Sequence, residues 1–360
     1  MHSTIRVAVV GAGYMGSAHA RVIRRIANEY PGLEELTYVV DVDKHRAANV
    51  ASKYGGTAID DIDKLPDDAI DFAFIATPTP LHFTVVRRLA ERGVRGFLIE
   101  KPMTRNLEEA INLIDLEREH GLWITVGHIE RFNPAVVALH RRVAIHSFGD
   151  ILTLIARRVG PFAARVKDTD VVYDLAIHEI DNALLIYRLL PYTVKSYTLG
   201  GIVSNLTDYA LAVLGYGNGF ASIEVNRVTP FKQRILYLTA RKGVVFLDYM
   251  KQELRLYRND EETIIRVNRE EPLYLEDLTA LRSFSVKSKP PVDTRQAFTA
   301  LYICEKILDS TRQGREIVLD KEDDFKTYNS ILEEGLKNYN RYMSELAATP
   351  GKHSLNTTYP

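Results

Sequence analysis

The stretch Ile5-Arg-Val-Ala-Val-Val-Gly-Ala-Gly-Tyr-Met-Gly16 determines the fold that we expect. It begins with a short apolar run typical of a buried strand, and its glycines come just before a helical pattern. In this setting Gly11 permits a tight turn, Gly13 lets a pyrophosphate approach the backbone, and Gly16 lets the helix pack on the strand. The helix N-terminus also offers unpaired N–H groups to phosphates. We therefore predict a dinucleotide-binding loop formed by Gly11, Ala12, Gly13, Tyr14, Met15 and Gly16.

The hydrophobic pattern changes once along the chain, which predicts two domains. Residues 5–126 alternate short apolar runs with longer helical patterns, as in a parallel sheet whose two faces are covered. From about residue 150, β-rich segments follow one another, with turns such as Gly217-Asn218-Gly219 between them. The expected fold is α/β: an N-terminal Rossmann, doubly wound parallel sheet, and a C-terminal α+β domain with a large, mostly antiparallel sheet. We place the domains at 1–127 and 128–346, with a flexible polar tail over 347–360.

The same pattern gives bounds for the individual elements. Strands are expected over 5–10, 35–40, 72–76, 96–99, 123–126, 151–159, 194–203, 209–215, 220–226, 234–240, 244–248, 253–257 and 263–267. Helices are expected over 17–28, 44–54, 80–91, 107–120, 171–189, 274–286, 294–313 and 321–344.

Composition and charge exclude several classes of partner. Lys plus Arg (46) nearly balance Asp plus Glu (47), so no global field attracts nucleic acid or an anionic membrane. No apolar run approaches the roughly 20 residues that span a bilayer, and the chain begins directly with a strand, without a cleavable signal. The single cysteine, Cys304, lies in an apolar helical run, where a buried thiol is expected rather than a nucleophile. We expect a cytoplasmic enzyme without nucleic-acid or membrane partners.

An acid follows the second expected strand, in Val39-Val40-Asp41. At that position Asp41 can accept hydrogen bonds from both adenosine ribose hydroxyls and repel a 2'-phosphate, which favours NAD over NADP. Its separation from Gly11 is 30 residues, more than the usual twenty or so, and we attribute the difference to an insertion over 28–34. The alternative is that Asp41 only caps a turn.

A lysine and an Asp/His pair indicate proton transfer beside the cofactor. Asp174 and His178 are four residues apart in an expected helix, so the carboxylate can orient the imidazole. His178 would then act as general base, while Lys101 would stabilise the developing alkoxide. The reverse assignment, with Lys101 as base, requires a lysine pKa lowered by burial or by a neighbouring charge. The structural alternative is an ordinary buried histidine with acids on the helix surface.

Four motifs together resemble the Gfo/Idh/MocA family of oxidoreductases: the glycine loop, Ala76-Thr-Pro-Thr-Pro-Leu-His82, Glu100-Lys101-Pro102 and Asp174-Leu-Ala-Ile-His178-Glu-Ile-Asp181. The chain is similar to this family over about residues 5–345. The resemblance implies NAD in the first domain, substrate beside the nicotinamide, and an open second sheet that forms a homodimer or homotetramer. It implies cofactor contacts from Ala76, Thr77, Pro78, His82, Glu100 and Lys101. It also implies a cis peptide at Pro102, although a trans strand terminator is the other possibility.

Three further segments, 127–134, 157–161 and 229–234, resemble the sugar-nucleotide dehydrogenases of the family. This resemblance implies hydride transfer from a secondary hydroxyl of a sugar or sugar nucleotide, with the 3-position of UDP-N-acetylglucosamine as the expected site. Guanidinium groups bind diphosphates bidentately. The candidate substrate residues are His128, Arg131, Asn133, Arg158, Asp181 and Arg234, with Arg157, Arg165, Lys167 and Lys232 as further cations. For these residues a hinge or surface role is the alternative.

Two other functions stay open. One is a dehydrogenase for free inositol or an aldose, which would need no nucleotide on its substrate. The other is a noncatalytic dinucleotide-sensing regulator, against which the presence of Lys101, Asp174 and His178 argues. The spacing of His, Cys, Asp and Glu gives no catalytic zinc site, so we expect no metal.

Overall fold

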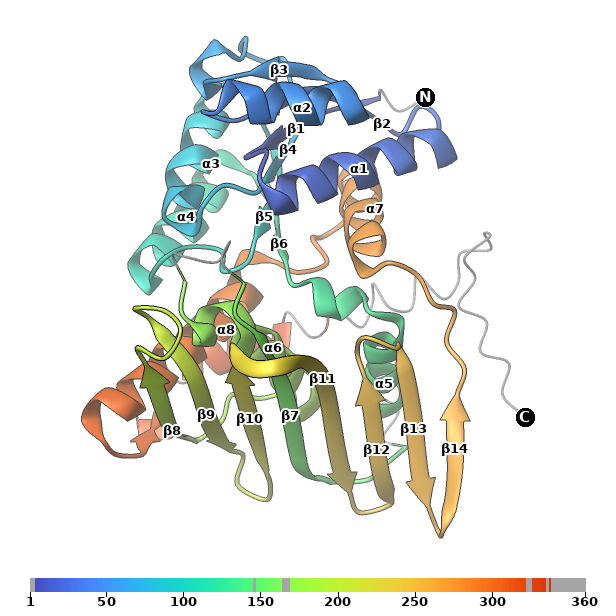
Figure 1. The fold of residues 1–360 in the computed structure, drawn as a ribbon, viewed down its shortest axis with the longest axis vertical. Helices are drawn as coiled ribbons and strands as arrows, with labels where there is room; N and C mark the ends of the chain where they lie inside the picture. The colour runs from blue at the N-terminus through green and yellow to red at the C-terminus, as the bar shows by residue number, and fades with distance from the viewer. Residues whose placement is uncertain (1–3, 145–146, 164–168, 322–325, 335–336, 338–360) are drawn as a thin grey trace. The chain divides into compact units, whose positions relative to one another are not determined.

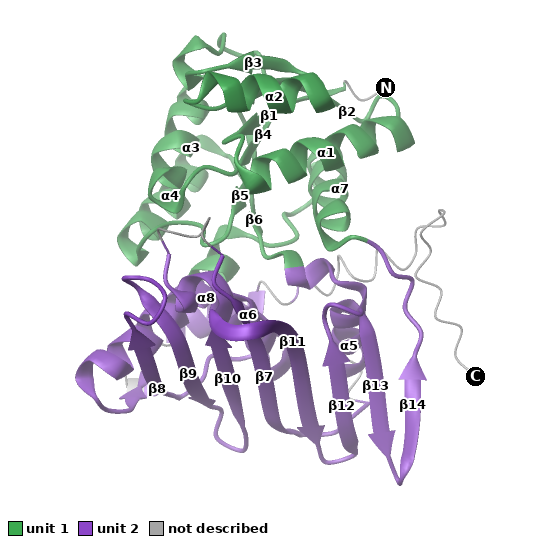
Figure 2. Cartoon of the chain, viewed as in Figure 1, with its two compact units in different colours: residues 1–129, 271–298 green, residues 130–270, 299–360 purple. Residues whose placement is uncertain are grey.

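The structure, a computed structural model, describes residues 4–144, 147–163, 169–321, 326–334 and 337 (Figure 1). The chain divides into two compact units, 1–129 with 271–298 and 130–270 with 299–360 (Figure 2). The first boundary lies two residues beyond the expected one, but the expected division was continuous, whereas 271–298 returns to the first unit. The tail expected over 347–360 lies outside the described residues.

The first unit is built on a six-stranded, all-parallel sheet in the order β3-β2-β1-β4-β5-β6. Its strands are β1 Ile5–Val10, β2 Glu34–Val40, β3 Thr57–Ile59, β4 Phe72–Ile75, β5 Gly96–Glu100 and β6 Trp123–Gly127. Its helices are α1 Tyr14–Glu29, α2 Lys44–Tyr54, α3 His82–Glu91, α4 Leu107–His120 and α7 Pro272–Ser285, with 3-10 turns η1 Ile62–Lys64 and η2 Thr79–Leu81. The strand order reverses between β1 and β4, and ligands of such sheets bind at the carboxyl ends beside that reversal.

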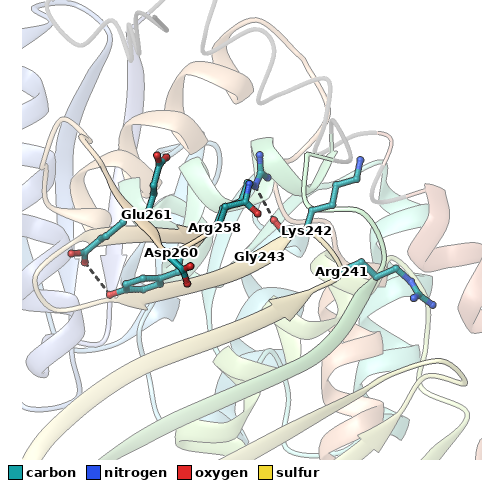
Figure 3. A pocket seen from close by; sticks show the side chains of 9 residues that line it. Arg241, Lys242, Gly243, Arg258, Asp260 and Glu261 are labelled. Atoms are coloured by element: carbon teal, nitrogen blue, oxygen red, sulfur yellow. Dashed lines mark hydrogen bonds between the residues drawn. The ribbon is translucent and has the colours of Figure 1, made fainter.

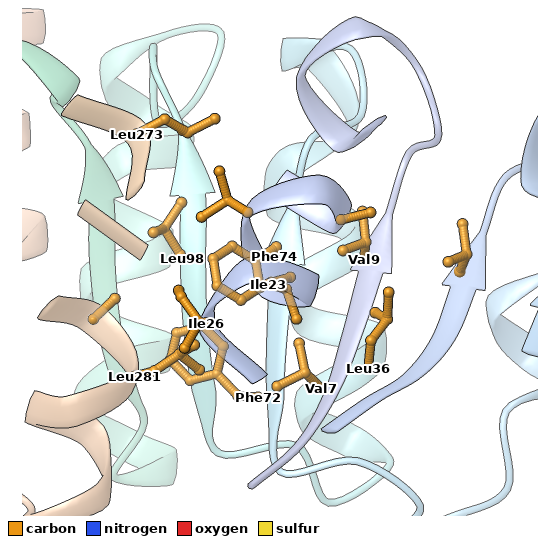
Figure 4. Packing of buried hydrophobic residues seen from close by; sticks show 14 of the residues in the cluster. Val7, Val9, Ile23, Ile26, Leu36, Phe72, Phe74, Leu98, Leu273 and Leu281 are labelled. Carbon is orange, nitrogen blue, oxygen red and sulfur yellow. The ribbon is translucent and has the colours of Figure 1, made fainter. Parts of the chain in front are cut away.

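The core of this unit lies between its sheet and the helices α1 and α7 (Figure 4). Val7 and Val9 of β1 are two residues apart in a strand and so point to the same face of the sheet. Ile23 and Ile26 of α1 are three residues apart and so lie on the same face of the helix. Leu281 of α7 packs into the same cluster. Full burial of each such side chain stabilises the fold by about 1.5–3 kcal/mol. The returning segment therefore belongs to this unit because its apolar face completes this core.

The second unit is built on a nine-stranded sheet in the order β14-β13-β12-β11-β7-β10-β9-β8-β15. Only β7 and β10 pair in parallel, so the sheet is mostly antiparallel, as expected. The strands are β7 Ile151–Pro161, β8 Thr193–Gly200, β9 Thr207–Gly215, β10 Phe220–Asn226, β11 Val228–Ala240, β12 Gly243–Asp248, β13 Glu253–Arg258, β14 Glu261–Ile265 and β15 Ile317–Val318.

The helices of the second unit include α5 Pro134–Ala144, α6 Ile177–Tyr187 and most of α8 Thr294–Gln313, with the short turns η3 Ile129–Phe132, η4 Val172–Ala176 and η5 Leu319–Lys321. Residues 326–334, within the helix expected over 321–344, are helical as well. In Figure 1, α5 and α6 lie on one face of the sheet, where they contact β12, β13, β7 and β10. On the other face the register aligns Tyr237 with Ile155 and Ile155 with Ser222. Tyr237 and Ile155 are 43% and 48% exposed, so this face presents apolar side chains to solvent. Among the described residues, no helix has the length and hydropathy needed to cross a bilayer.

Candidate active site

The glycine loop joins β1 to α1 as the sequence predicts, and each of its glycines meets a different constraint. Gly11 has φ +96°, and a Cβ there would lie 2.5 Å from the Ala76 carbonyl oxygen. A Cβ on Gly16 would lie 1.6 Å from the carbonyl oxygen of Gly11, so the helix packs directly on the turn. A Cβ on Gly13 would meet nothing within 4 Å, and no side chain caps α1. The open space over Gly13 and the uncapped N–H groups of α1 fit a pyrophosphate.

Asp41 lies directly after β2 and contacts the glycine loop. Its Oδ2 accepts the Ala12 N–H at 2.7 Å and its Oδ1 accepts the Asp43 N–H at 2.8 Å. Arg46 Nη2 lies 3.1 Å from the same Oδ1. The side chain of Asp41 is therefore fixed at the carboxyl end of β2, where an acid can bind the adenosine ribose. A carboxylate has about four acceptor sites, so these contacts leave capacity for ribose hydroxyls.

His82 connects the loop after β4 to the segment after β5. It is 1% exposed. Its Nε2 lies 2.9 Å from the carbonyl oxygen of Thr77, and its Nδ1 lies 3.1 Å from the carbonyl oxygen of Pro102. Burial lowers the pKa of His82, so the ring is neutral. The hydroxyl of Thr77 is buried and has no hydrogen-bond partner among the described residues, which fits a contact to a bound cofactor. The Lys101–Pro102 peptide bond is cis, as the resemblance implied.

Lys101 follows β5 immediately, at the same sheet edge as the glycine loop. The Oε2 of Glu100 accepts the Lys101 backbone N–H at 3.2 Å. Its Oε1 lies 3.0 Å from Nε2 of His19, whose Nδ1 lies 2.9 Å from Oδ2 of Asp277 in α7. Sequence reasoning missed His19 and Asp277. The sequence could have pointed to His19, because a histidine on the apolar face of α1 needs a buried partner. It gave no such signal for Asp277, which lies 258 residues further along the chain.

In the second unit, Asp174 lies in η4, a π-helical turn, and His178 lies in the first turn of the α-helix that follows. The expected helix over 171–189 thus forms, but it opens with a wider turn. π-helical turns occur frequently at functional sites. His178 is 8% exposed.

Three of the six candidate substrate residues, Arg131, Arg158 and Asp181, form buried ion pairs within the second unit. Arg131 donates from Nε and Nη2 to the two carboxylate oxygens of Asp181 at 2.8 and 2.5 Å, and both residues are at most 2% exposed. Arg158 donates to Glu179 at 2.7 Å and to Glu130 at 2.8 Å. These contacts join the residues after β6 to β7 and to α6, the helix that carries His178.

Two neutral side chains extend this network. Asn133 donates to Oε2 of Glu130 at 3.2 Å and to the Tyr249 carbonyl at 3.0 Å. The Tyr249 hydroxyl donates to Glu179 at 2.6 Å. Asn133 therefore connects the start of the second unit to the residue that follows β12, which fits the hinge role that we considered for it. His128 precedes this segment, at the end of the first unit, and is 1% exposed.

Arg234 differs from Arg131 and Arg158 because its side chain is 40% exposed. Its Nη1 lies 4.0 Å from Oε1 of Glu130. The Arg158 guanidinium lowers the pKa of Arg234, and burial adds to this, while nearby carboxylates that include Asp174 oppose it. Arg165 and Lys167 lie outside the described residues.

A separate hollow of about 790 Å³ lies at the β11–β12 and β13–β14 turns of the second unit (Figure 3). Lys242, Arg258 and Asp260 are among its lining residues, and Arg258 donates to the Lys242 carbonyl at 2.8 Å. None of the predicted site residues lines it. It is a surface feature of exposed turns with charges of both signs.

A parallel sheet with an open glycine turn, an acid after β2 and a lysine after β5 defines a dinucleotide-dependent oxidoreductase. The chain belongs to the Gfo/Idh/MocA family, described as an oxidoreductase family with an NAD-binding Rossmann fold, whose family model matches residues 5–128. UDP-N-acetylglucosamine 3-dehydrogenase of Acidithiobacillus ferrooxidans is 32% identical over 261 residues, which cover 72% of this chain and 79% of that protein. The scyllo-inositol 2-dehydrogenase (NAD(+)) of Bacillus subtilis is 29% identical over 70% of this chain and 76% of that protein.

Solved structures agree with this membership. A structure of the Acidithiobacillus enzyme matches with a TM-score of 0.78 at 28% identity, covering 86% of this chain and 98% of that one. Levoglucosan dehydrogenase in complex with NADH and levoglucosan matches with a TM-score of 0.79 at 17% identity, a likeness of fold alone, covering 88% and 99% of the two chains. The family, the fold class, NAD as the cofactor and an NAD-dependent dehydrogenase as the class of enzyme are confirmed.

Proposed function

We propose that this chain oxidises a secondary hydroxyl of a sugar nucleotide with NAD, and that the 3-hydroxyl of UDP-N-acetylglucosamine is the first substrate to test. The observation that carries the proposal is the match to UDP-N-acetylglucosamine 3-dehydrogenase, which covers 79% of that enzyme at 32% identity and so extends well beyond the first unit. Inositol 2-dehydrogenases match as well, for example at 32% identity over 63% of this chain for the Corynebacterium glutamicum enzyme. Oxidation of free inositol is therefore the second candidate.

NAD would be held by the glycine loop and Asp41, with Ala76, Thr77 and Pro78 beside the nicotinamide half. The space over Gly13 and the buried Thr77 hydroxyl support this assignment. When bound, NAD supplies the hydride acceptor, and the residues of the chain have to orient the substrate and move its proton. His82 would act by holding the Thr77 and Pro102 carbonyls, to one of which its neutral ring donates, and not by touching NAD.

Lys101, Asp174 and His178 would carry the proton chemistry. We assign His178 as general base for the hydroxyl proton, with Asp174 orienting the imidazole and Lys101 hydrogen-bonded to the reacting oxygen. The alternative, with Lys101 as base and His178 as the hydrogen-bonding partner, uses the same three groups.

Arg234 is the candidate substrate cation that the contacts favour. Its guanidinium is partly exposed, and a diphosphate would offer it a bidentate partner. Arg131, Arg158 and Asp181 already pair inside the protein, so we assign them to the support of α6 and not to direct phosphate binding. His128 and Asn133 would act at the hinge before the second unit.

We also propose that the exposed face of the nine-stranded sheet forms a homodimer or homotetramer. Tyr197, Tyr237 and Ile155 on this face are 63%, 43% and 48% exposed, an apolar surface of the kind that marks protein interfaces. A cytoplasmic location stays a prediction. Cys304 is buried and is the single cysteine of the chain, so no disulfide forms within it, which is compatible with that location.

The proposal is tested by mixing the protein and NAD with UDP-N-acetylglucosamine, UDP-glucose, free N-acetylglucosamine and myo-inositol, while following reduced-nicotinamide absorbance. We expect reduction with UDP-N-acetylglucosamine and much slower reduction with the free sugar. Equal rates with and without the nucleotide would favour the second candidate. Tight NAD binding with no reduction by any substrate would favour a noncatalytic regulator.

A further inference from the structure

The first unit contains a buried row of three ionisable side chains: His19 of α1, Glu100 of β5 and Asp277 of α7. The imidazole of His19 lies between the two carboxylates, with one ring nitrogen at hydrogen-bond distance from each. His19 and Asp277 are 0% exposed and Glu100 is 8% exposed. The oxygen of Glu100 that does not face His19 accepts the backbone N–H of Lys101. The row therefore ends at the lysine that the proposed function uses.

The geometry favours a charged His19 wherever both carboxyl groups are ionised. Burial raises the pKa of Asp277 to about 6, so this condition holds above about that pH. A neutral imidazole has one N–H and one lone pair, so between two carboxylates it would place a lone pair against an anion. A doubly protonated ring donates to both. Burial opposes the charged ring, but Asp277 and Glu100 outweigh it and raise the pKa of His19 well above its ordinary value. Burial also opposes a charged Glu100, yet His19 and then Lys101 hold the pKa of that carboxyl below its ordinary value.

We propose that His19 and Asp277 are positioning residues for Lys101: Asp277 keeps His19 cationic, and His19 fixes the charged Glu100 carboxylate against the Lys101 backbone. This proposal rests on the proposed function, since it takes Lys101 as the group that contacts the reacting oxygen. Without His19, the buried Glu100 carboxylate would lose its hydrogen-bonded cationic partner, and it would gain a proton or turn away.

The position of His19 in α1 adds a second consequence. Gly16, at the start of α1, packs on the glycine loop, and His19 lies one turn further along the same helix. One rigid element therefore carries both the phosphate-binding turn and the partner of Glu100. Asp277 comes from the returning segment, which explains in functional terms why 271–298 belongs to the first unit.

The first test compares Asp277→Asn with Tyr274→Phe. Both changes remove a contact between α7 and α1, because the Tyr274 hydroxyl donates to Glu29 at 2.6 Å, but only Asp277 contacts His19. Asp277→Asn should lower kcat about 10- to 100-fold, part of the two to four orders that a positioned acid or base contributes. The Kd for NAD should stay within about 3-fold of wild type, because the phosphate and ribose contacts remain. Tyr274→Phe should keep wild-type kcat, and an equal loss in both variants would overturn the proposal.

A double variant tests whether Asp277 acts through Lys101. If it does, Asp277→Asn should cost nothing further in a Lys101→Ala background. If the kcat of the double variant is instead lowered by the product of the two single-variant factors, Asp277 does not act through Lys101. Wild-type turnover in Lys101→Ala alone would contradict the proposed function, whereas a slow Lys101→Ala with an unimpaired Asp277→Asn would contradict this inference only.

A third measurement needs no substrate and no folded Asp277 variant. Nitrogen-15 spectra of wild-type imidazoles should contain one ring that stays doubly protonated at about pH 8, well above the ordinary histidine pKa of about 6.5. That signal should be absent from His19→Asn. If every histidine of the wild-type protein is neutral at that pH, the proposal is wrong.

Discussion

At the scale of single residues, Glu34 is a buried acid that the proposed chemistry does not use. It lies at the start of β2 and is 3% exposed. Burial, with a smaller effect from the charge of Glu35, raises the pKa of Glu34 to about 8. The folded state thus holds a proton that the unfolded state releases at its ordinary pKa of about 4.3.

Glu34→Gln should therefore stabilise the protein in a pH-dependent way. An acid whose pKa is raised by folding contributes to the free energy of unfolding, and this stabilising contribution is fully present below pH 4–5. It is lost as the pH rises toward about 8, and above that pH the stability no longer changes with the titration of Glu34. The variant should match wild type near pH 4 and exceed it at pH 8, with a gain of roughly 1–4 kcal/mol in unfolding free energy. Denaturant melts at both pH values measure this. Glu35→Gln, on the exposed side of the strand, should give a much smaller change, and a pH-independent gain for Glu34→Gln would contradict the account.

Asp41 should determine the preference for NAD. Asp41→Ser removes the acceptor for ribose hydroxyls and releases Arg46, which lies 3.1 Å from Asp41 Oδ1. We expect the variant to bind NAD more weakly by about 1–3 kcal/mol, so that the difference in affinity between NAD and NADP becomes smaller. Lys44 also lies near this position in the sequence, but its ammonium pairs with Asp60 at 2.9 Å, so we expect Arg46 to contribute more to binding of the 2'-phosphate. Titration of both cofactors against both proteins measures the effect, and tight NADP binding by the unmodified chain would show that Asp41 does not contact the ribose.

At this scale the sequence predicts residues whose role depends on near neighbours in the chain. The glycine loop and Asp41 are recognisable because strand, turn and helix constrain them locally. His19 and Asp277 are not, because His19 acquires its function from partners 81 and 258 residues away. The same holds for the ion pairs of Arg158 with Glu130 and Glu179, which lie 28 and 21 residues away in the sequence.

At the scale of elements, the turn from β1 into α1 separates two roles of glycine. Gly16→Ala would bring a Cβ to 1.6 Å from the Gly11 oxygen, so α1 would have to move. Gly13→Ala meets no protein atom within 4 Å, so its methyl group would occupy only space that a pyrophosphate needs. We expect Gly16→Ala to lower Tm clearly, and Gly13→Ala to keep Tm but weaken NAD at least about tenfold, as a loss of 1.4 kcal/mol would do. Normal NAD affinity in a well-folded Gly13→Ala would contradict this division.

Periodicity predicted the long elements well and the short ones poorly. The helices α2, α4 and α8 and the strand β10 have the expected bounds, because their apolar spacing or their turn residues mark both ends. β3, β15 and α5 were not expected. β3 and β15 have three and two residues, too few for a period to appear. α5 begins at Pro134 with the apolar run Ala-Val-Val-Ala-Leu, which periodicity alone does not distinguish from a strand.

At the scale of the whole molecule, an exposed apolar sheet face predicts self-association. Ile155 and Tyr237 lie opposite each other in the register of β7 and β11, at the middle of the nine-stranded sheet. Ile155→Glu with Tyr237→Lys should convert a dimer or tetramer to a monomer by placing charges in the interface. Light scattering with size-exclusion chromatography measures the mass. Ile111→Glu, an exposed change on α4 of the other unit, is the matched control. A wild-type protein that is monomeric at all concentrations would contradict the proposed interface.

The discontinuous division of the chain into two units could not be predicted from the sequence. Pattern reasoning assigns each segment to the domain of its neighbours in sequence, and 271–298 follows eight strands of the second sheet. Its apolar face nevertheless packs on α1, and Leu273 and Leu281 join the core of the first unit. Such long-range packing leaves no local mark in the sequence.

The most direct test of the central claim is the turnover of Lys101→Ala, with UDP-N-acetylglucosamine and NAD as substrates and NAD affinity measured alongside. The account predicts a kcat lower by about two to four orders of magnitude, because Lys101 stabilises charge on the reacting oxygen. It predicts an NAD Kd within about 3-fold of wild type, because the phosphate and ribose contacts come from the glycine loop and Asp41. Wild-type turnover in Lys101→Ala, at unchanged NAD affinity, would contradict the assignment of the active site.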